Sequence, residues 1–273
     1  MRWLRWLALA AVLIGFCAWM IYAGGLYVFQ DAILFPAPST PRQAYDAQAD
    51  RSGIETFTLT TDDGLTLYGW HARGRGQRAL IFFHGNGGGV DAVPWFREQL
   101  GPDVDVFAVH YRGYPGSEGH PSEAGLALDA RALWEHVTGT VGIPAERIVV
   151  HGQSLGGGVA LMLLQDVQPA ALVLDSTFLG VDRIAADRFW MAPTFLLANP
   201  FRSFERAPNV RVPALVIHGD ADTLIPVAHG RGLAELLPDA TYLEVEGGGH
   251  HQFLPAQPQV NPRWRAFVEH ALR

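Results

Sequence analysis

Short apolar runs alternate with longer mixed stretches over most of the chain, a pattern typical of strands that alternate with helices. The apolar runs predict strands at 79–83, 104–109, 147–150, 171–174, 214–217 and 240–245. The stretches between them predict helices near 93–100, 122–137, 155–165, 227–237 and 261–271. Alternation of this kind favours an α/β fold, in which parallel strands carry helices on both faces of the sheet.

Two further strands precede this alternation. Residues 55–60 and 65–70 have strand character, and Thr61-Asp62-Asp63-Gly64 between them ends in Asp-Gly, which is a hairpin signal. They bring the expected sheet to eight mostly parallel strands. Ligands bind at the carboxyl ends of the strands in such sheets, so the residues that follow each strand are the candidates for chemistry.

An apolar run also opens the chain. Arg2 and Arg5 precede an uncharged stretch over 6–29, which would form a helix about 36 Å long. Such a helix can cross a hydrocarbon core about 30 Å thick with some tilt. The positive-inside rule then places the arginines in the cytoplasm and the rest of the chain on the non-cytoplasmic, periplasmic side. The alternative is a signal peptide cleaved near Ala23-Gly24-Gly25, which would leave a secreted or periplasmic protein.

The sequence after this run is rich in proline, and residues 35–41 cannot hold a regular helix. We therefore expect three parts: an N-terminal transmembrane anchor or signal peptide over 1–29, a Pro-rich linker over 30–53 and an α/β domain over 54–273. No internal repeat or low-complexity tract interrupts the domain.

A serine follows one of the predicted strands. Gly152-Gln153-Ser154-Leu155-Gly156 lies between the apolar strand 147–150 and an apolar helix. This strand–turn–helix context makes the G-x-S-x-G pentapeptide typical of a nucleophile elbow, where the serine is held in a strained backbone conformation. The two glycines lack Cβ, so the strand and the helix can pass close together. Ser154 is the candidate nucleophile.

A serine hydroxyl needs a base, and the base needs an acid that orients it, here expected in the chain order Ser, Asp or Glu, His. Asp220 and Asp222 follow the next-to-last strand. We assign Asp222 as the orienting acid and Asp220 to shaping the turn, with Asp175 at another strand end as an alternative acid. The base is assigned to His250, which follows three glycines after the last strand, with His251 as the alternative.

Two backbone N–H groups are the candidate donors to the oxyanion of the reaction. The Leu155 N–H lies at the start of a helix, and the second donor is assigned to Asn86 in the glycine-rich loop 84–89, with Gly87 as the alternative. Such a loop can instead cradle a phosphate. However, G-x-G-x-x-G is absent and all twenty basic residues are Arg, so there is no Walker lysine. These residues require no metal or organic cofactor.

Together these motifs resemble the alpha/beta-hydrolases of the small membrane-anchored kind, which include acyl-protein depalmitoylating thioesterases and related bacterial proteins. The resemblance covers roughly residues 55–272 and rests on Phe83-His84-Gly85-Asn86-Gly87-Gly88, Tyr111-Arg112-Gly113-Tyr114-Pro115-Gly116-Ser117, Gly152-Gln153-Ser154-Leu155-Gly156-Gly157, His218-Gly219-Asp220-Ala221-Asp222 and Gly247-Gly248-Gly249-His250. It implies an alpha/beta-hydrolase fold and a serine hydrolase with the triad Ser154, Asp222 and His250. The stretch between Asp175 and Arg211 is too short for a large cap domain, so we expect none. One departure is His251, where relatives often carry Asn. The substrate is not fixed, because this fold hosts many chemistries.

The amino-acid composition and net charge limit the classes of partner that the chain is expected to bind. A hydrophobic share of 49% allows a large core, and the net charge of −7 disfavours nucleic acid as a partner. The single Cys17 excludes an intrachain disulfide. We expect a small-molecule or acyl-group substrate, and the membrane as a partner of the N-terminal helix.

Between the strands at 171–174 and 214–217 the chain departs from simple alternation. Residues 188–197 are rich in large apolar groups and form either a short helix packed on the core or one wall of an acyl-binding groove near the membrane. The leading functional hypothesis is cleavage of carboxylic ester or thioester bonds through an acyl-serine intermediate. Peptide cleavage by the same triad and a non-catalytic binding protein on the hydrolase fold are the alternatives.

Overall fold

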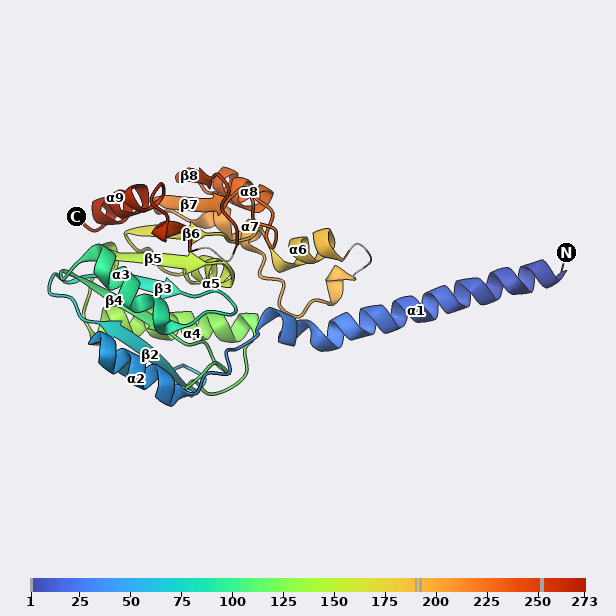
Figure 1. Cartoon of the computed structure of the whole chain (residues 1–273), viewed down its shortest axis with the longest axis horizontal. Helices are drawn as coiled ribbons and strands as arrows, with labels where there is room; N and C mark the ends of the chain where they lie inside the picture. The colour runs from blue at the N-terminus through green and yellow to red at the C-terminus, as the bar shows by residue number, and fades with distance from the viewer. Residues whose placement is uncertain (1, 190, 192, 251–252) are drawn as a thin grey trace.

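The computed structural model describes residues 2–189, 191, 193–250 and 253–273. Its centre is one eight-stranded sheet with the order β1-β2-β4-β3-β5-β6-β7-β8 (Figure 1). The strands are β1 (Glu55–Thr60), β2 (Thr66–Ala72), β3 (Arg78–Phe83), β4 (Val104–Val109), β5 (Ile148–Gln153), β6 (Ala171–Asp175), β7 (Ala214–Gly219) and β8 (Ala240–Val245). β2 pairs antiparallel with β1 and β4, and the other neighbours are parallel. The mostly parallel eight-stranded sheet is therefore confirmed.

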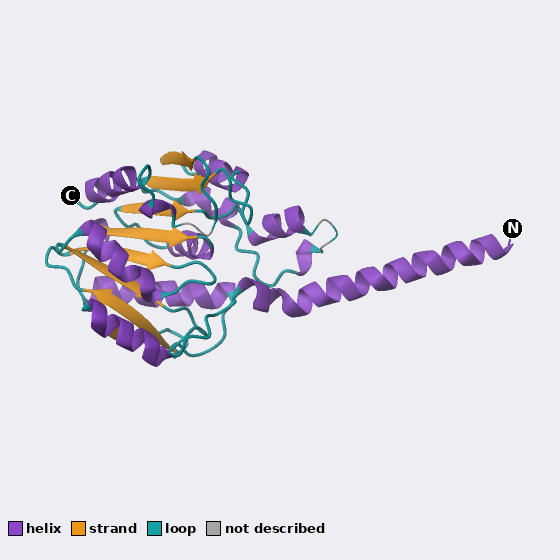
Figure 2. Ribbon diagram, in the orientation of Figure 1, coloured by secondary structure: helices purple, strands orange, loops and turns teal. Residues whose placement is uncertain are grey.

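Helices cover both faces of the sheet (Figure 2). One face carries α2 (Arg42–Ser52), α3 (Val93–Leu100) and α9 (Asn261–Ala271), and the other carries α4 (Glu123–Glu135), α5 (Leu155–Leu163) and α8 (Ala228–Leu236). Side chains alternate along each strand, so Leu80 and Phe82 of β3 pack on the face that carries α2, α3 and α9, and Ile81 and Phe83 pack on the opposite face. Burial on both faces explains why the central strands are continuous apolar runs.

The connection between β6 and β7 contains only short helices in its described part: α6 (Val181–Arg188), a 3-10 turn at Thr194–Leu196, α7 (Ser203–Arg206) and a 3-10 turn at Ala207–Asn209. This agrees with the expected lack of a large cap domain. Other short helical turns lie at Val90–Ala92, His136–Thr140, Ala145–Arg147 and Leu254–Ala256.

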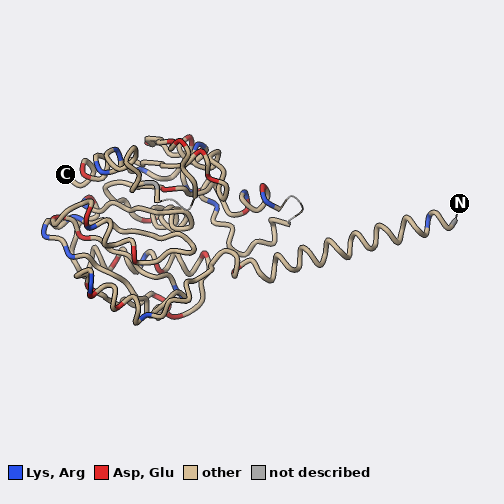
Figure 3. The backbone as a smooth tube through the Cα atoms, viewed as in Figure 1, with Lys and Arg blue, Asp and Glu red and all other residues tan. Residues whose placement is uncertain are grey.

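The N-terminal helix α1 (Arg2–Leu34) projects from the body as a long rod (Figure 1). Its 33 residues correspond to about 50 Å, and the helix is long and apolar enough to cross a membrane by length and composition. Charged residues are spread over the body (Figure 3), whereas within α1 they occur only near its two ends. Large apolar side chains along the helix are exposed.

Two boundaries differ from the expected parts of the chain. α1 continues past residue 29 to Leu34, and α2 lies inside the range 30–53 that was expected to be linker. Within the range 30–53, the proline-rich residues 35–41 and the helix-ending Gly53 lie outside the helices. α2 forms because it buries Tyr45 and Ala49 against the sheet, a tertiary contact that the polar character of this segment does not reveal.

Candidate active site

The predicted site residues lie at the carboxyl edge of the sheet. Ser154 directly follows β5, Asp222 follows β7, His250 follows β8 and Asn86 follows β3. Parallel strands end at the same edge, so residues from four distant parts of the chain meet there. Asn86, Ser154 and Leu155 line a common cavity of about 200 Å³.

The turn at Ser154 has the geometry of a nucleophile elbow. Ser154 has φ 50° and ψ −117°, a conformation that costs energy for a residue with a Cβ. Its N–H donates to the Asp175 carbonyl oxygen at 2.8 Å, and its carbonyl oxygen accepts from the Thr177 hydroxyl at 2.6 Å. A Cβ on Gly152 or Gly156 would overlap neighbouring backbone atoms. The two glycines therefore let α5 pass close enough to β5 and β3 to hold the serine in place.

Ser154, His250 and Asp222 form a continuous chain of contacts. Ser154 Oγ lies 3.1 Å from His250 Nε2, and His250 Nδ1 lies 2.7 Å from Asp222 Oδ2. A carboxylate only accepts hydrogen bonds, so in this arrangement Nδ1 donates to Asp222 and Nε2 faces the serine hydroxyl as an acceptor. The structure thus brings together the three side chains that the sequence singled out. His251, the alternative base, lies outside the described residues.

The environment of Asp222 keeps its carboxylate ionised. Burial acts to raise its pKa, but hydrogen bonds from His218, His250 and the Ile225 amide outweigh burial and hold the pKa below its usual range. Its second oxygen, Oδ1, accepts from the N–H groups of Leu224 and Ile225, each at 2.8 Å. A fixed negative charge on Asp222 can stabilise the imidazolium that forms when His250 accepts a proton.

Asp220 was expected to shape its own turn, but its side chain bonds the glycine loop instead, and the amides of the turn donate to Asp222. Its Oδ1 accepts from the Gly247 N–H at 2.7 Å, and the Ala221 N–H donates to the Gly248 carbonyl oxygen at 3.0 Å. These contacts tie the turn after β7 to the glycine loop that carries His250. The acid and the base are therefore held by one connected pair of loops.

Asp175, the alternative acid, is buried beneath the elbow. One carboxyl oxygen accepts from the Ser176 hydroxyl at 2.9 Å, and the other has no hydrogen-bond partner among the described residues. Burial raises the pKa of Asp175 to about 7. The contacts of Asp222 with His250 favour Asp222 as the orienting acid.

The loop after β3 packs directly against the serine. A Cβ on Gly85 would lie 3.4 Å from Ser154 Cβ. The Gly85 carbonyl oxygen is held by His84 Nδ1 at 2.8 Å and by the Gly88 N–H at 3.0 Å. The Asn86 N–H belongs to the same peptide unit and points the opposite way, because the peptide is trans. Leu155, which also lines the cavity, is the first residue of α5. Its N–H is therefore one of the first N–H groups of a helix, which have no partner within the helix.

Two tyrosines with no role predicted from the sequence support this loop. The Tyr114 hydroxyl donates to the Asn86 carbonyl oxygen at 2.6 Å, and the Tyr111 hydroxyl donates to the His84 carbonyl oxygen at 2.9 Å. Both tyrosines come from the loop after β4, which lies beside β3 in the sheet. The Tyr-Arg-Gly-Tyr stretch was the only sequence signal that could have indicated a role for these tyrosines, and it does not reveal which atoms they contact.

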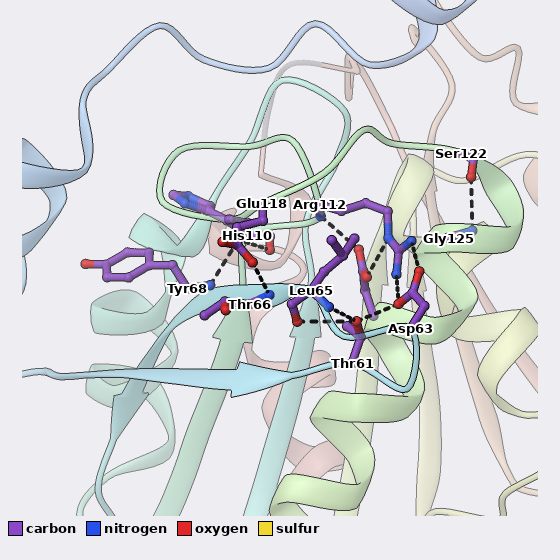
Figure 4. Close-up of polar contacts among 12 residues, drawn as sticks. Thr61, Asp63, Leu65, Thr66, Tyr68, His110, Arg112, Glu118, Ser122 and Gly125 are labelled. Carbon is purple, nitrogen blue, oxygen red and sulfur yellow. Dashed lines mark hydrogen bonds and ion pairs between the residues drawn. The ribbon is translucent and has the colours of Figure 1, made fainter.

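Arg112, between the two tyrosines, anchors their loop (Figure 4). Its guanidinium bonds the Asp63 carboxylate at 2.8 Å and the buried Asp129 carboxylate of α4 at 2.8 Å. The Arg112 N–H also donates to Asp129 at 2.8 Å. The hydrogen bonds from Arg112 lower the pKa of Asp63 to about 2. Arg112 thereby joins three parts of the chain: the hairpin turn before β2, the loop after β4, and α4.

The cavity at Ser154 has mainly apolar walls. Residues of the stretch 188–197 line it, among them Phe189, Pro193 and Leu196. None of the described residues of this stretch is buried, and Phe195 is 81% exposed, which favours a groove wall over a short helix packed on the core. Trp190 and Ala192 of this stretch lie outside the described residues.

Comparisons with known proteins agree with this architecture. A family model for the alpha/beta hydrolase fold matches residues 78–212, and a model described as TAP-like protein matches residues 195–272. An uncharacterized protein of Mycobacterium tuberculosis is 36% identical over 199 residues, which cover 71% of each chain.

Alpha/beta hydrolase domain-containing protein 17C of Xenopus laevis is 31% identical over 231 residues, which cover 83% of this chain and 73% of the relative. Among solved structures, an esterase of Pyrococcus furiosus superposes with a TM-score of 0.66 at 19% identity. That superposition covers 82% of this chain and 92% of the esterase, and at this sequence identity it shows a shared fold alone.

Proposed function

The chain belongs to the alpha/beta-hydrolase family, and on this basis we propose that it is a serine hydrolase that cleaves carboxylic ester or thioester bonds. The observation that carries the proposal is the chain of contacts from Ser154 Oγ through His250 to Asp222, at 3.1 Å and 2.7 Å. A serine in an elbow conformation beside an imidazole that contacts an ionised carboxylate is suited to acyl transfer. A non-catalytic binding role would not require this alignment.

In the proposed reaction, Ser154 Oγ attacks the carbonyl carbon while His250 Nε2 accepts the serine proton. The Asn86 and Leu155 N–H groups stabilise the negative oxygen, and one such donor typically contributes about 3–4 kcal/mol to the transition state. The intermediate collapses to an acyl-serine, and the departing alcohol or thiol takes the proton from His250. Water then attacks the acyl-serine with His250 as base, which releases the carboxylic acid and restores the serine.

The proposal is tested with esters, thioesters and aminoacyl amides of matched acyl group. The wild type should hydrolyse the ester and thioester faster than the amide, and Ser154→Ala should abolish each activity. Faster cleavage of the amide would instead favour the peptidase alternative. Absence of any hydrolysis by folded protein would support a binding role.

We also propose that α1 is a single-pass anchor with the catalytic domain on the non-cytoplasmic side. The arginines at its start support this orientation, because basic residues stay in the cytoplasm. Protease added to the outside of spheroplasts should digest the catalytic domain of the anchored protein. The mass of the protein recovered from cells separates an intact anchor from cleavage near Ala23-Gly24-Gly25.

A further inference from the structure

We infer that the last part of α1 forms one wall of the substrate groove, and that the groove takes a single long linear acyl chain entering from a bilayer. The inference deepens the proposed function and rests on it. One wall of the cavity at Ser154 comes from α1, through Ala23, Leu26, Tyr27, Gln30, Ile33 and Leu34. These positions recur at intervals of three and four residues, so they form one face of the helix.

The opposite wall comes from the connection between β6 and β7. Phe178, Ile184, Phe189, Leu196 and Leu197 contribute to it, and all of them are apolar. Ser154, Leu155 and Asn86 lie in the same cavity, so the apolar groove leads to the proposed nucleophile and oxyanion donors. An apolar cavity that ends at an acyl-transfer site is suited to the hydrocarbon part of an acyl substrate.

Polar contacts hold the two walls together. The Ala198 N–H donates to Gln30 Oε1 at 2.7 Å, and Asn199 Nδ2 donates to Asp31 Oδ1 at 2.8 Å. Toward the membrane end, Trp19 Nε1 donates to the Met191 carbonyl oxygen at 3.0 Å. α1 is therefore fixed to Met191 at one end of the groove and to Ala198 and Asn199 at the other, and it is part of the site rather than a free tether.

The length of α1 separates an anchoring part from a groove-lining part. A hydrocarbon core of about 30 Å takes up about twenty helical residues, so a span that begins at Trp3 ends near Tyr22. The groove-lining face begins at the next residue, Ala23, and runs to Leu34. That face extends about 16 Å, close to half the thickness of the hydrocarbon core and thus to one acyl chain of a single leaflet.

The rim of the groove is suited to contact with lipid. Phe195 is 81% exposed, and Met191 and Leu196 are each 41% exposed, beside the part of α1 that leaves the membrane. Exposed large apolar side chains gathered next to a membrane-type helix are expected where a protein surface meets the interfacial region of a bilayer. A chain held in the adjacent leaflet can then enter the groove without crossing water.

The test blocks the groove from the α1 side in the full-length protein. Leu26→Trp should lower kcat/KM for the p-nitrophenyl hexadecanoate ester about tenfold more than kcat/KM for the butanoate ester, because only the long chain passes Leu26. Val28→Trp is the matched control: Val28 is two residues away on α1, is 70% exposed and does not line the cavity. This variant should keep the wild-type ratio.

Ala185→Trp, on the opposite wall, gives a second block that does not alter α1. It should shift the same ratio in the same direction, and an unchanged ratio in both blocking variants would overturn the inferred groove. Loss of butanoate hydrolysis in the wild type would instead count against the proposed function itself. Entry from the bilayer predicts faster hydrolysis when enzyme and hexadecanoate ester share phosphatidylcholine vesicles than when they occupy separate vesicles. Equal rates would contradict that route.

Discussion

The Tyr114 hydroxyl donates a hydrogen bond of 2.6 Å to the carbonyl oxygen of Asn86, the residue whose N–H is the proposed second oxyanion donor. The contact joins two loops that follow neighbouring strands, and it fixes the peptide unit next to the donor. Because oxyanion donors act only when they are positioned in advance, the tyrosine is expected to act on catalysis without touching the substrate.

Tyr114→Phe removes this contact and leaves the ring in place. Loss of this partly buried hydrogen bond, about 1–2 kcal/mol, should lower kcat about fivefold to thirtyfold while KM changes little. Steady-state kinetics on a short-chain ester measure both parameters. A rise in KM at constant kcat would show that Tyr114 shapes substrate binding instead. Tyr242→Phe is a control, because its hydroxyl contacts Glu244 on the surface.

Asp222→Asn tests the assignment of the acid. An amide in place of the carboxylate favours the wrong imidazole tautomer, so kcat should fall about ten-thousandfold. Asp220→Asn is the matched variant in the same turn, since Asp220 contacts Gly247 rather than His250. Its kcat should fall less than about tenfold, because one contact of the supporting loop weakens. Comparable losses in the two variants would contradict the division of roles between the aspartates.

The buried carboxyl of Asp175 predicts a pH dependence of stability. Burial raises its pKa from 3.8 to about 7, while nearby His218 acts to lower it and Asp222 acts to raise it. The folded protein then retains a proton that the unfolded chain releases, so this residue lowers the free energy of unfolding as pH rises from about 4 to about 7.

Urea unfolding at several pH values measures this effect. Between about pH 4 and pH 7, the free energy of unfolding should decline less in Asp175→Asn than in the wild type, because asparagine does not titrate. Parallel pH profiles for the two proteins would mean that Asp175 titrates normally in the folded state.

Gly156 tests the packing that holds the elbow. A Cβ there would overlap the backbone at the end of β3, so Gly156→Ala should lower the free energy of unfolding by about 1–3 kcal/mol or more. Gly139→Ala is the control, because nothing lies within 4 Å of the added Cβ. That variant should be neutral or stabilised by up to about 1 kcal/mol, as denaturant unfolding can show. Equal effects at the two positions would argue against close packing as the reason for Gly156.

Much of the sheet could be predicted from the sequence, because strands that are buried on both faces are continuous apolar runs, such as 79–83. The alignment of Ser154 with His250 was predictable for a related reason, since parallel strands bring their carboxyl ends to one edge. The contact from Tyr114 to Asn86 was not predictable. It depends on the relative position of two irregular loops, and neither loop has a periodic pattern.

The N-terminal boundaries show the same limit. The apolar run over 6–29 indicated a membrane-type helix but not its extension to Leu34, where it packs on the rest of the chain. α2 has few apolar residues, and its formation depends on burying only Tyr45 and Ala49. Tertiary contacts determine where α1 ends and whether α2 forms, and the local composition of these segments does not reveal those contacts.

The most direct test of the central claim is covalent labelling of the folded full-length protein with a fluorophosphonate, read out by intact mass and peptide mapping. Such probes react with a serine only when a base activates it. We predict one adduct, located on Ser154, that is lost in Ser154→Ala and strongly slowed in Asp222→Asn. An unlabelled wild type, or an adduct that persists in Ser154→Ala, would contradict the claim that Ser154 is the activated nucleophile.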